Sequence, residues 1–236
     1  MKKKALRIFF GVAAGLLALV FFIRITKVQF SGNTRYTSEQ LESIIFRGSF
    51  SKNTLYAWIQ SMIGRKTKIP FVQDYTVEIT GPGSAEVIIY EKSMVGCISY
   101  MDSYMYFDKD GIVVESANRI LEGIPVVEGL DFSNIVLYEA LPVENKEVFH
   151  EILNLTQVLT GYNISVERIK ILPGGKALLY VDEIEVDLGE NKDINGKLGE
   201  LKDILPELRR RGEAGTLYLD SYDRNKDKSS YYFKRR

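Results

Sequence analysis

Cysteine and histidine are nearly absent from this chain of 236 residues, which contains one of each. Because Cys97 has no second cysteine to pair with, no disulfide forms within the chain, and packing must hold the fold together. Cys97 lies in an apolar stretch, so we expect a small buried residue rather than a reactive thiol. His150 is the only histidine that a Ser-His-Asp triad could use. It falls on the polar side of an expected helix, which favours a solvated residue over a pH switch.

Short motifs of known chemistry are also missing. The sequence has no HExxH, CxxC, Walker A or EF-hand pattern. Asp108 and Asp110 fit a hairpin turn better than a cation site, because the other loop ligands are lacking. The 31 basic and 31 acidic side chains balance, which argues against a nucleic-acid binder. We therefore expect no catalytic residue, cofactor or metal, and neither a nucleic acid nor a small molecule as ligand.

The one long apolar run stands at the N-terminus. Ile8 to Ile23 carries no charge, and Lys2–Lys4 and Arg7 precede it. This pattern predicts a signal anchor that crosses a membrane once. A cleaved signal peptide is the less favoured alternative, because no small-residue pattern ends the run. We expect residues 1–7 in the cytoplasm, residues 8–25 in the membrane, and the remainder of the chain outside the cytoplasm.

The first part after this run predicts a small mixed unit. Thr37 and Gln40 have the spacing of a capping box, in which each side chain binds the other residue's backbone N–H. Alternating apolar residues predict strands, and apolar residues three and four apart predict helices. The expected order is strand, helix, helix, strand, strand, at residues 25–30, 37–45, 55–62, 75–79 and 85–89.

The second part predicts a larger unit of strands and two helices. Pro206 lies inside the later helix and cannot donate a backbone hydrogen bond, so we expect a break or kink near Leu205. The expected helices are 146–160 and 194–208. The expected strands are 95–101, 104–108, 112–115, 166–172, 177–181, 184–188, 216–220 and 229–233.

Several motifs carry a family resemblance. V-Q-F-S-G-N-T-R-Y-T-S-E-Q-L, from Val28 to Leu41, resembles the start of the POTRA domain in the bacterial division protein FtsQ, called DivIB in Gram-positive bacteria. E-K-S-M-V-G, from Glu91, is similar to the family's Glu-Arg-x-x-x-Ala segment, with Lys92 and Gly96 as departures. Y-F-D-K-D-G-I-V-V and I-P-V-V-E-G match two later segments of the family in order.

The C-terminal part also resembles this family. V-D-L-G, then a helix, then T-L-Y-L-D ending at Asp220, follows the family's order. Ser221 and Tyr222 come next, where the family typically carries an arginine after the aspartate. The resemblance implies an α+β fold with a single N-terminal transmembrane helix, a βααββ POTRA domain at 26–93, and an FtsQ/DivIB-type mixed β-sheet domain with flanking helices at 94–236.

The resemblance also implies a function. Members of the family are non-enzymatic scaffolds of the divisome that bind the membrane proteins FtsB (DivIC in Gram-positive bacteria) and FtsL at the septum, where peptidoglycan is made. Their last strands accept a strand from FtsB/DivIC. Carried over to this sequence, the partner site consists of Tyr218, Asp220, Tyr222, Ser230, Tyr231, Tyr232 and Phe233.

The residues themselves also favour partner binding at the end of the chain. A terminal strand has one edge with unpaired backbone groups, and aromatic side chains are frequent anchors of interfaces. Alternation along a strand places either Tyr231 and Phe233, or Tyr232 alone, on the inner face. Two alternatives stay open, namely another POTRA-bearing export or assembly component, and an anchored cell-wall hydrolase or sensor.

Overall fold

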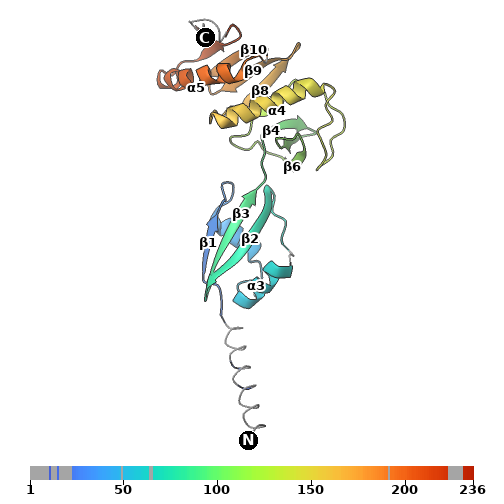
Figure 1. The fold of residues 1–236 in the computed structure, drawn as a ribbon, viewed down its shortest axis with the longest axis vertical. Helices are drawn as coiled ribbons and strands as arrows, with labels where there is room; N and C mark the ends of the chain where they lie inside the picture. Colours follow the sequence, from blue (N-terminus) through green and yellow to red (C-terminus); the bar gives the residue numbers. More distant parts are fainter. Residues whose placement is uncertain are drawn as a thin grey trace. The chain divides into compact units, whose positions relative to one another are not determined.

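The chain folds into two compact units, Met1–Lys92 and Ser93–Arg236, which are described separately. We analysed a computed structural model of the chain (Figure 1). It describes residues 11, 15, 23–48, 50–63, 66–190, 192–222 and 231–236.

The expected fold class, which begins with a transmembrane helix, is wrong for the part of the chain that the structure describes. This part is an α+β fold with mixed sheets and four helices, α2 to α5. None of these helices is long and apolar enough to cross a membrane. The longest, α5, has 17 residues and a charged exposed face, whereas a span needs about 20 mostly apolar residues. The expected anchor at 8–25 lies almost wholly outside the described residues.

The first unit packs two helices on a three-stranded sheet in the order β1-β3-β2. Strand β1 runs parallel to β3, and β2 runs antiparallel to it. Leu41 of α2 and Ala57 of α3 share a buried core with Val87 of β3. The elements are β1 (Lys27–Ser31), α2 (Ser38–Ile45), α3 (Thr54–Ile63), β2 (Val72–Gly81) and β3 (Ser84–Glu91).

Two sets of hydrogen bonds fix the loop that leads from β1 into α2. The capping box of Thr37 and Gln40 is confirmed, with both reciprocal hydrogen bonds present. Glu91, at the end of β3, accepts hydrogen bonds from the backbone N–H groups of Thr34 at 2.6 Å and Arg35 at 2.9 Å. Burial alone would raise the pKa of Glu91, but a hydrogen bond from the Thr34 hydroxyl, the two backbone hydrogen bonds and the Arg35 charge together lower it.

Replacing Glu91 with glutamine removes the carboxylate that these donors bind. We expect Glu91→Gln to lower the free energy of unfolding of the first unit by about 1–3 kcal/mol at neutral pH. The native pKa is below the unfolded value near 4.5, so this stabilisation is present above that value and is lost as the pH falls through the native pKa. Urea unfolding followed by fluorescence of Trp58, the only tryptophan, reports on this unit.

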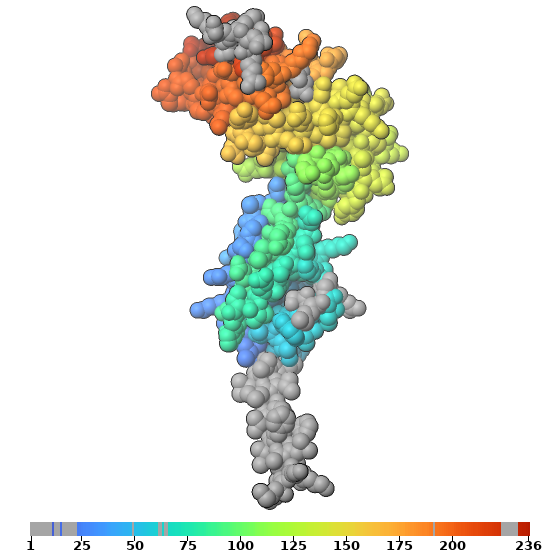
Figure 2. Space-filling model, viewed as in Figure 1, coloured from blue at the N-terminus to red at the C-terminus, as the bar shows by residue number. Residues whose placement is uncertain are grey.

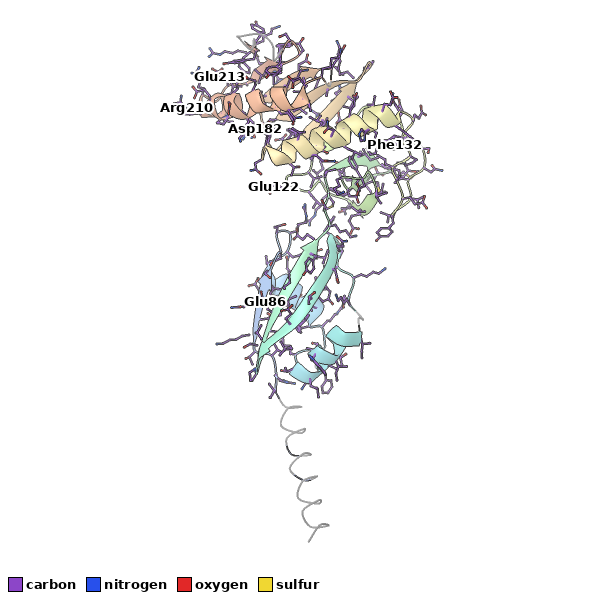
Figure 3. The ribbon with its side chains drawn as sticks, viewed as in Figure 1. Glu86, Glu122, Phe132, Asp182, Arg210 and Glu213 are labelled. Carbon is purple, nitrogen blue, oxygen red and sulfur yellow. The ribbon has the colours of Figure 1, made fainter. Side chains whose placement is uncertain are left out.

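Glu86→Gln is the matched control on the same strand. Glu86, labelled in Figure 3, accepts a single long hydrogen bond from the described residues, at 3.5 Å from Ser31. An equal loss of stability in both variants at neutral pH would contradict the role given to Glu91.

The second unit is a nine-stranded mixed sheet in the order β12-β11-β10-β9-β8-β7-β4-β5-β6. Helices α4 and α5 lie side by side over one face, in yellow and orange in Figures 1 and 2. The elements are β4 (Gly96–Tyr100), β5 (Ser103–Phe107), β6 (Val113–Ala117), β7 (Val126–Glu128), α4 (Lys146–Gly161), β8 (Arg168–Leu172), β9 (Lys176–Val181), β10 (Ile184–Gly189), α5 (Ile194–Arg210), β11 (Gly215–Tyr218) and β12 (Tyr232–Arg235).

The two helices bury the apolar stripes that their sequences predict. Phe149, Ile152 and Leu159 of α4 are buried with Leu198 and Leu201 of α5 against the inner residues of the strands. His150 lies on the exposed side of α4.

Of the break or kink expected near Leu205, the break does not occur, since α5 continues through Pro206 to Arg210. Leu205 and Leu208 on either side of the proline are buried in the core. Pro206 itself and Lys202, whose carbonyl loses its usual partner, are on the exposed side, where water can solvate that carbonyl.

Cys97 is buried, as expected, beneath the segment that follows β6. Tyr106 lies opposite Cys97 in the ladder, and its hydroxyl donates to Arg119 O at 2.8 Å. Burial raises the pKa of the Cys97 thiol to about 12, and the nearby Tyr106 side chain opposes this shift only in part. The thiolate, which is the reactive form, is therefore scarce in the folded protein.

We expect Cys97 to react with a disulfide reagent such as DTNB at least about 100-fold more slowly in the native chain than in the unfolded one. The measurement is the rate of thiol release at mildly alkaline pH with and without denaturant. Rapid, complete reaction of the native chain would contradict the burial of Cys97.

Candidate functional site

The two edges of the nine-stranded sheet differ in how the chain covers them. At β6, Val113 donates to Glu139 O at 2.9 Å and accepts from Tyr138 N at 2.7 Å, so the loop that follows covers part of this edge. At the other edge, no described strand pairs with the far side of β12. Because uncovered edges invite pairing with another chain, β12 is the first candidate for a binding site.

Strand β12 starts later than expected, at Tyr232 rather than at residue 229. Its length is set by β11, because the ladder joins Tyr218 to Tyr232 and Gly215 to Arg235. A side chain on Gly215 would collide with the backbone of Lys234, so glycine permits the close approach of the two strands. Tyr231 lies just before the strand and is exposed, and Ser230 is outside the described residues.

The aromatic residues of β12 divide between the two faces of the sheet. Phe233 lies opposite the fully buried Leu217 and packs on the core. Tyr232 is 62% exposed on the outer face, and its ring centroid is 5.8 Å from that of Tyr218 on β11. Of the two arrangements that alternation permits, the structure therefore has Phe233 inside, and Tyr218 and Tyr232 form an aromatic pair outside.

The backbone of β12 offers a defined set of groups to a partner. Arg236 N donates to Ala214 O at 3.0 Å, which fixes which pairs of the antiparallel ladder are hydrogen-bonded. By alternation, Tyr232 and Lys234 bond to β11, whereas Phe233 and Arg235 direct their N–H and C=O groups away from it. An added strand would bond to these two residues.

The outer face carries a network of charged and aromatic side chains in the middle of the sheet, on β7, β8 and β9. The Arg168 guanidinium lies 4.0 Å from the ring centroid of Tyr180 and 3.5 Å from the Glu128 carboxylate. Burial, followed by the carboxylate of Glu185, raises the pKa of Tyr180. The helices cover the other face, so this one is available beside β12.

Asp220 and Tyr222 lie away from the β12 ladder and fasten the chain that leaves β11. Leu219 N donates to Asp187 O at 2.8 Å. A side-chain carbon on Gly189 would lie 2.8 Å from Asp220, and one on Gly196 would lie 2.5 Å from the Tyr222 ring. These two predicted site residues therefore anchor the β11–β12 connection to β10 and α5.

Lys197 is the buried charge beneath this connection. Only 2% of the residue is exposed, and its Nζ donates to Leu188 O at 2.6 Å and Glu190 O at 2.8 Å. Burial lowers its pKa, and the nearby carboxylates of Asp220 and Asp187 partly oppose this shift. Lys197 thus links the first turn of α5 to the end of β10.

Sequence reasoning missed Lys197, because a lysine among leucines on an expected helix resembles an ordinary surface residue. Gly189 and Gly196 were the signal in the sequence that another segment packs closely at this place. Gly196 within a helix is unfavourable unless something packs against it, and here Tyr222 does.

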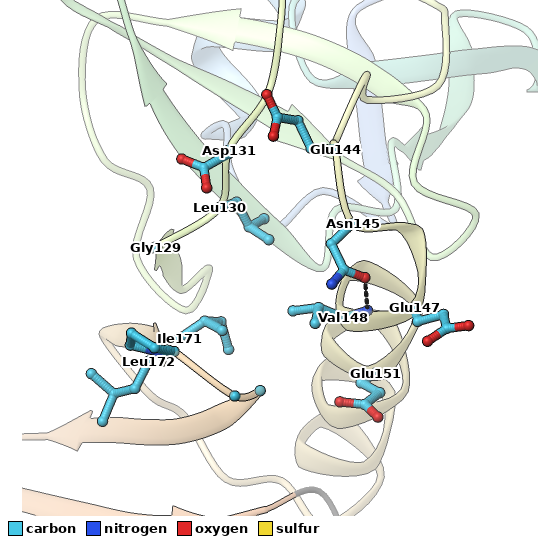
Figure 4. A pocket seen from close by; sticks show the side chains of 13 residues that line it. Gly129, Leu130, Asp131, Glu144, Asn145, Glu147, Val148, Glu151, Ile171 and Leu172 are labelled. Atoms are coloured by element: carbon cyan, nitrogen blue, oxygen red, sulfur yellow. Dashed lines mark hydrogen bonds between the residues drawn. The ribbon is translucent and has the colours of Figure 1, made fainter.

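A groove in the same unit lies between the start of α4, the chain after β7 and the β8–β9 turn (Figure 4). Its volume is about 710 Å³. Leu130, Val148 and Ile171, which also pack on the core, form its apolar part. Asn145 at its rim caps α4 by accepting from Val148 N at 3.1 Å.

A third surface lies on α3 of the first unit. Tyr56, Trp58, Ile59 and Ile63 are each more than a third exposed, as is Phe50 just before the helix. Thr54 N donates to Ile23 O at 3.1 Å, so α3 begins beside the point where the apolar N-terminal run ends. This face is a further apolar contact surface.

No protein-family model matches the chain, and no curated protein is similar enough to count as a relative.

Replacing Lys197 with methionine tests the buried link. We expect Lys197→Met to lower the free energy of unfolding by about 1–3 kcal/mol at neutral pH, because two carbonyls lose their donor. The native pKa of Lys197 is below the unfolded value near 10.5, so the unfolded chain binds more protons between the two values. The wild-type advantage should therefore grow as the pH rises toward 10.5.

Denaturant unfolding followed by far-ultraviolet circular dichroism at several pH values measures this difference. Lys146→Met, at an exposed position on α4, is the control and should be neutral. A wild-type advantage that shrinks with rising pH would contradict the burial of Lys197 and the lowered pKa that follows from it.

Proposed function

We propose that the chain is a non-enzymatic scaffold of the bacterial divisome, of the FtsQ/DivIB kind. In this proposal it binds FtsB/DivIC-like and FtsL-like membrane proteins at the septum and so supports septal peptidoglycan synthesis. The partner adds a strand to β12. The proposal concerns only the two folded units, of which the first is a POTRA domain.

The proposal rests mainly on the far edge of β12, which no described strand pairs with. The opposite edge, β6, is partly covered by the chain's own loop, whereas no described strand covers β12. Tyr231 and Tyr232 are 50% and 62% exposed there. Main-chain hydrogen bonds from such an edge provide affinity, and exposed aromatic side chains provide anchors.

The order of elements gives further support. The first unit has the order strand, helix, helix, strand, strand, which is the order that the family's first domain implies. Its Glu91 holds the loop at Thr34 and Arg35, two positions within the stretch that carries the resemblance. A second unit of mixed sheet with flanking helices follows, as in the family's β domain.

The chemistry of the described residues favours binding over catalysis. The only cysteine is buried with a raised pKa, and the only histidine is exposed on a helix. Among the described residues, no three acidic, cysteine or histidine side chains are grouped to hold a metal ion.

The side-chain part of the proposal is tested with Tyr232→Lys. We expect binding of the full chain to its FtsB/DivIC-like partner to weaken at least about tenfold, because the anchor on the outer face is lost. Isothermal titration calorimetry measures the affinity. Tyr90→Lys, at a 50% exposed tyrosine of the first unit, is the control and should bind normally.

The backbone part is tested with two substitutions at one position. Arg235→Ala and Arg235→Pro both remove the ion pair with Glu213, a residue labelled in Figure 3, but only proline also removes the outward N–H. We expect Arg235→Pro to weaken partner binding about tenfold more than Arg235→Ala does. Equal affinities in these two variants, together with normal binding by Tyr232→Lys, would overturn strand addition at β12.

A further inference from the structure

The groove at the start of α4 combines two features that together specify a ligand. Its volume of about 710 Å³ lies within the range of pockets that hold small ligands and peptide segments. It has an apolar part and an acidic rim. Neither of these features belongs to the β12 edge.

The charge of the groove is of one sign. None of the thirteen lining residues is basic, and four are acidic: Asp131, Glu144, Glu147 and Glu151. Glu147 lies in the first turn of α4, where the helix dipole already balances part of its charge. Glu151 approaches the β8–β9 turn, with its Oε2 3.7 Å from the position of a side-chain carbon on Gly175. The rim therefore attracts positive charge in a chain whose net charge is zero.

The strand that lines the groove is occupied along both sides. Strands β7 and β8 are in register as far as Glu128 and Lys170, where β7 ends. A side-chain carbon on Gly129 would lie 2.2 Å from Ile171 O, so the chain after β7 runs directly against Ile171, and β9 pairs with the other side of β8. A peptide in the groove would therefore be held by side-chain contacts and charge rather than by pairing with β8.

We propose that the groove binds a short basic segment of a partner protein, in which an apolar residue stands between lysines or arginines. The apolar residue contacts Leu130, Val148 and Ile171, and the basic side chains reach Asp131, Glu144 and Glu151. A bare cation would use the carboxylates but leave the apolar part unoccupied. An apolar segment without charge would leave the rim unpaired.

Binding of a labelled peptide to the full chain tests this site. The probe is a fluorescein-labelled Lys-Leu-Arg-Val-Lys-Arg peptide, measured by fluorescence anisotropy at low salt. We expect saturable binding that weakens at least about tenfold in Glu144→Gln/Glu151→Gln and falls further as salt is added. A peptide with serine and threonine in place of leucine and valine should also bind about tenfold more weakly.

Matched controls separate this groove from general attraction between charges. Glu122→Gln/Glu183→Gln removes the same charge from two exposed positions outside the groove and should change the affinity less than about twofold. Tyr232→Lys should also leave peptide binding unchanged, which distinguishes this site from the edge of β12.

Four results would overturn the proposal. They are the absence of saturable binding, an equal loss in the two double variants, equal binding of the serine–threonine peptide, and a loss of binding in Tyr232→Lys. Methyl resonances of Leu130, Val148 and Ile171 that shift on addition of the peptide would place it directly in the groove.

Discussion

The packing of α4 and α5 on one face of the nine-stranded sheet is the interaction on which the second unit depends. The chain has one cysteine, so no internal disulfide holds the sheet, and the buried stripes of the two helices must do so. Fully buried residues such as Leu179, Leu198 and Leu217 come from elements far apart in the chain. Because both helices lie on the same face, the β12 edge and the outer face next to it are left for other contacts.

The distribution of polar groups follows from this one-sided packing. On the covered face, the buried amine of Lys197 is satisfied by two carbonyls of the chain itself. On the open face, Arg168, Tyr180 and Glu185 interact with one another but stay partly exposed. Lys197 uses two of its three N–H donors within the chain, whereas the partly solvated charges on the open face can exchange water for a partner.

Much of this fold was predictable from local pattern. The capping box at Thr37, the stripe of α4 and the turn at Gly111 each depend on residues close together in the sequence, and each is present. The turn at Gly111 is held by Asp108 Oδ1, which accepts from Ile112 N at 2.9 Å. Periodicity and turn chemistry act over a few residues, so a sequence displays them directly.

What the sequence did not display depends on contacts between distant segments. Pro206 does not break α5, because the burial of Leu205 and Leu208 outweighs the loss of one hydrogen bond. Asp220 and Tyr222, two residues of the expected partner site, lie against Gly189 and Gly196, a packing that the sequence pattern did not indicate. Helix propensity and the position of a motif do not indicate which residues from distant segments will be in contact, because these contacts depend on tertiary packing.

The two binding surfaces proposed in the second unit differ in chemistry, which limits what each can recognise. The β12 edge presents exposed tyrosines and outward backbone groups, so its affinity comes from main-chain pairing and aromatic contact. The groove presents carboxylates around an apolar part, so it selects charge and rejects acidic segments. Neither surface shares a residue with the other. One partner segment can therefore occupy the edge while another occupies the groove.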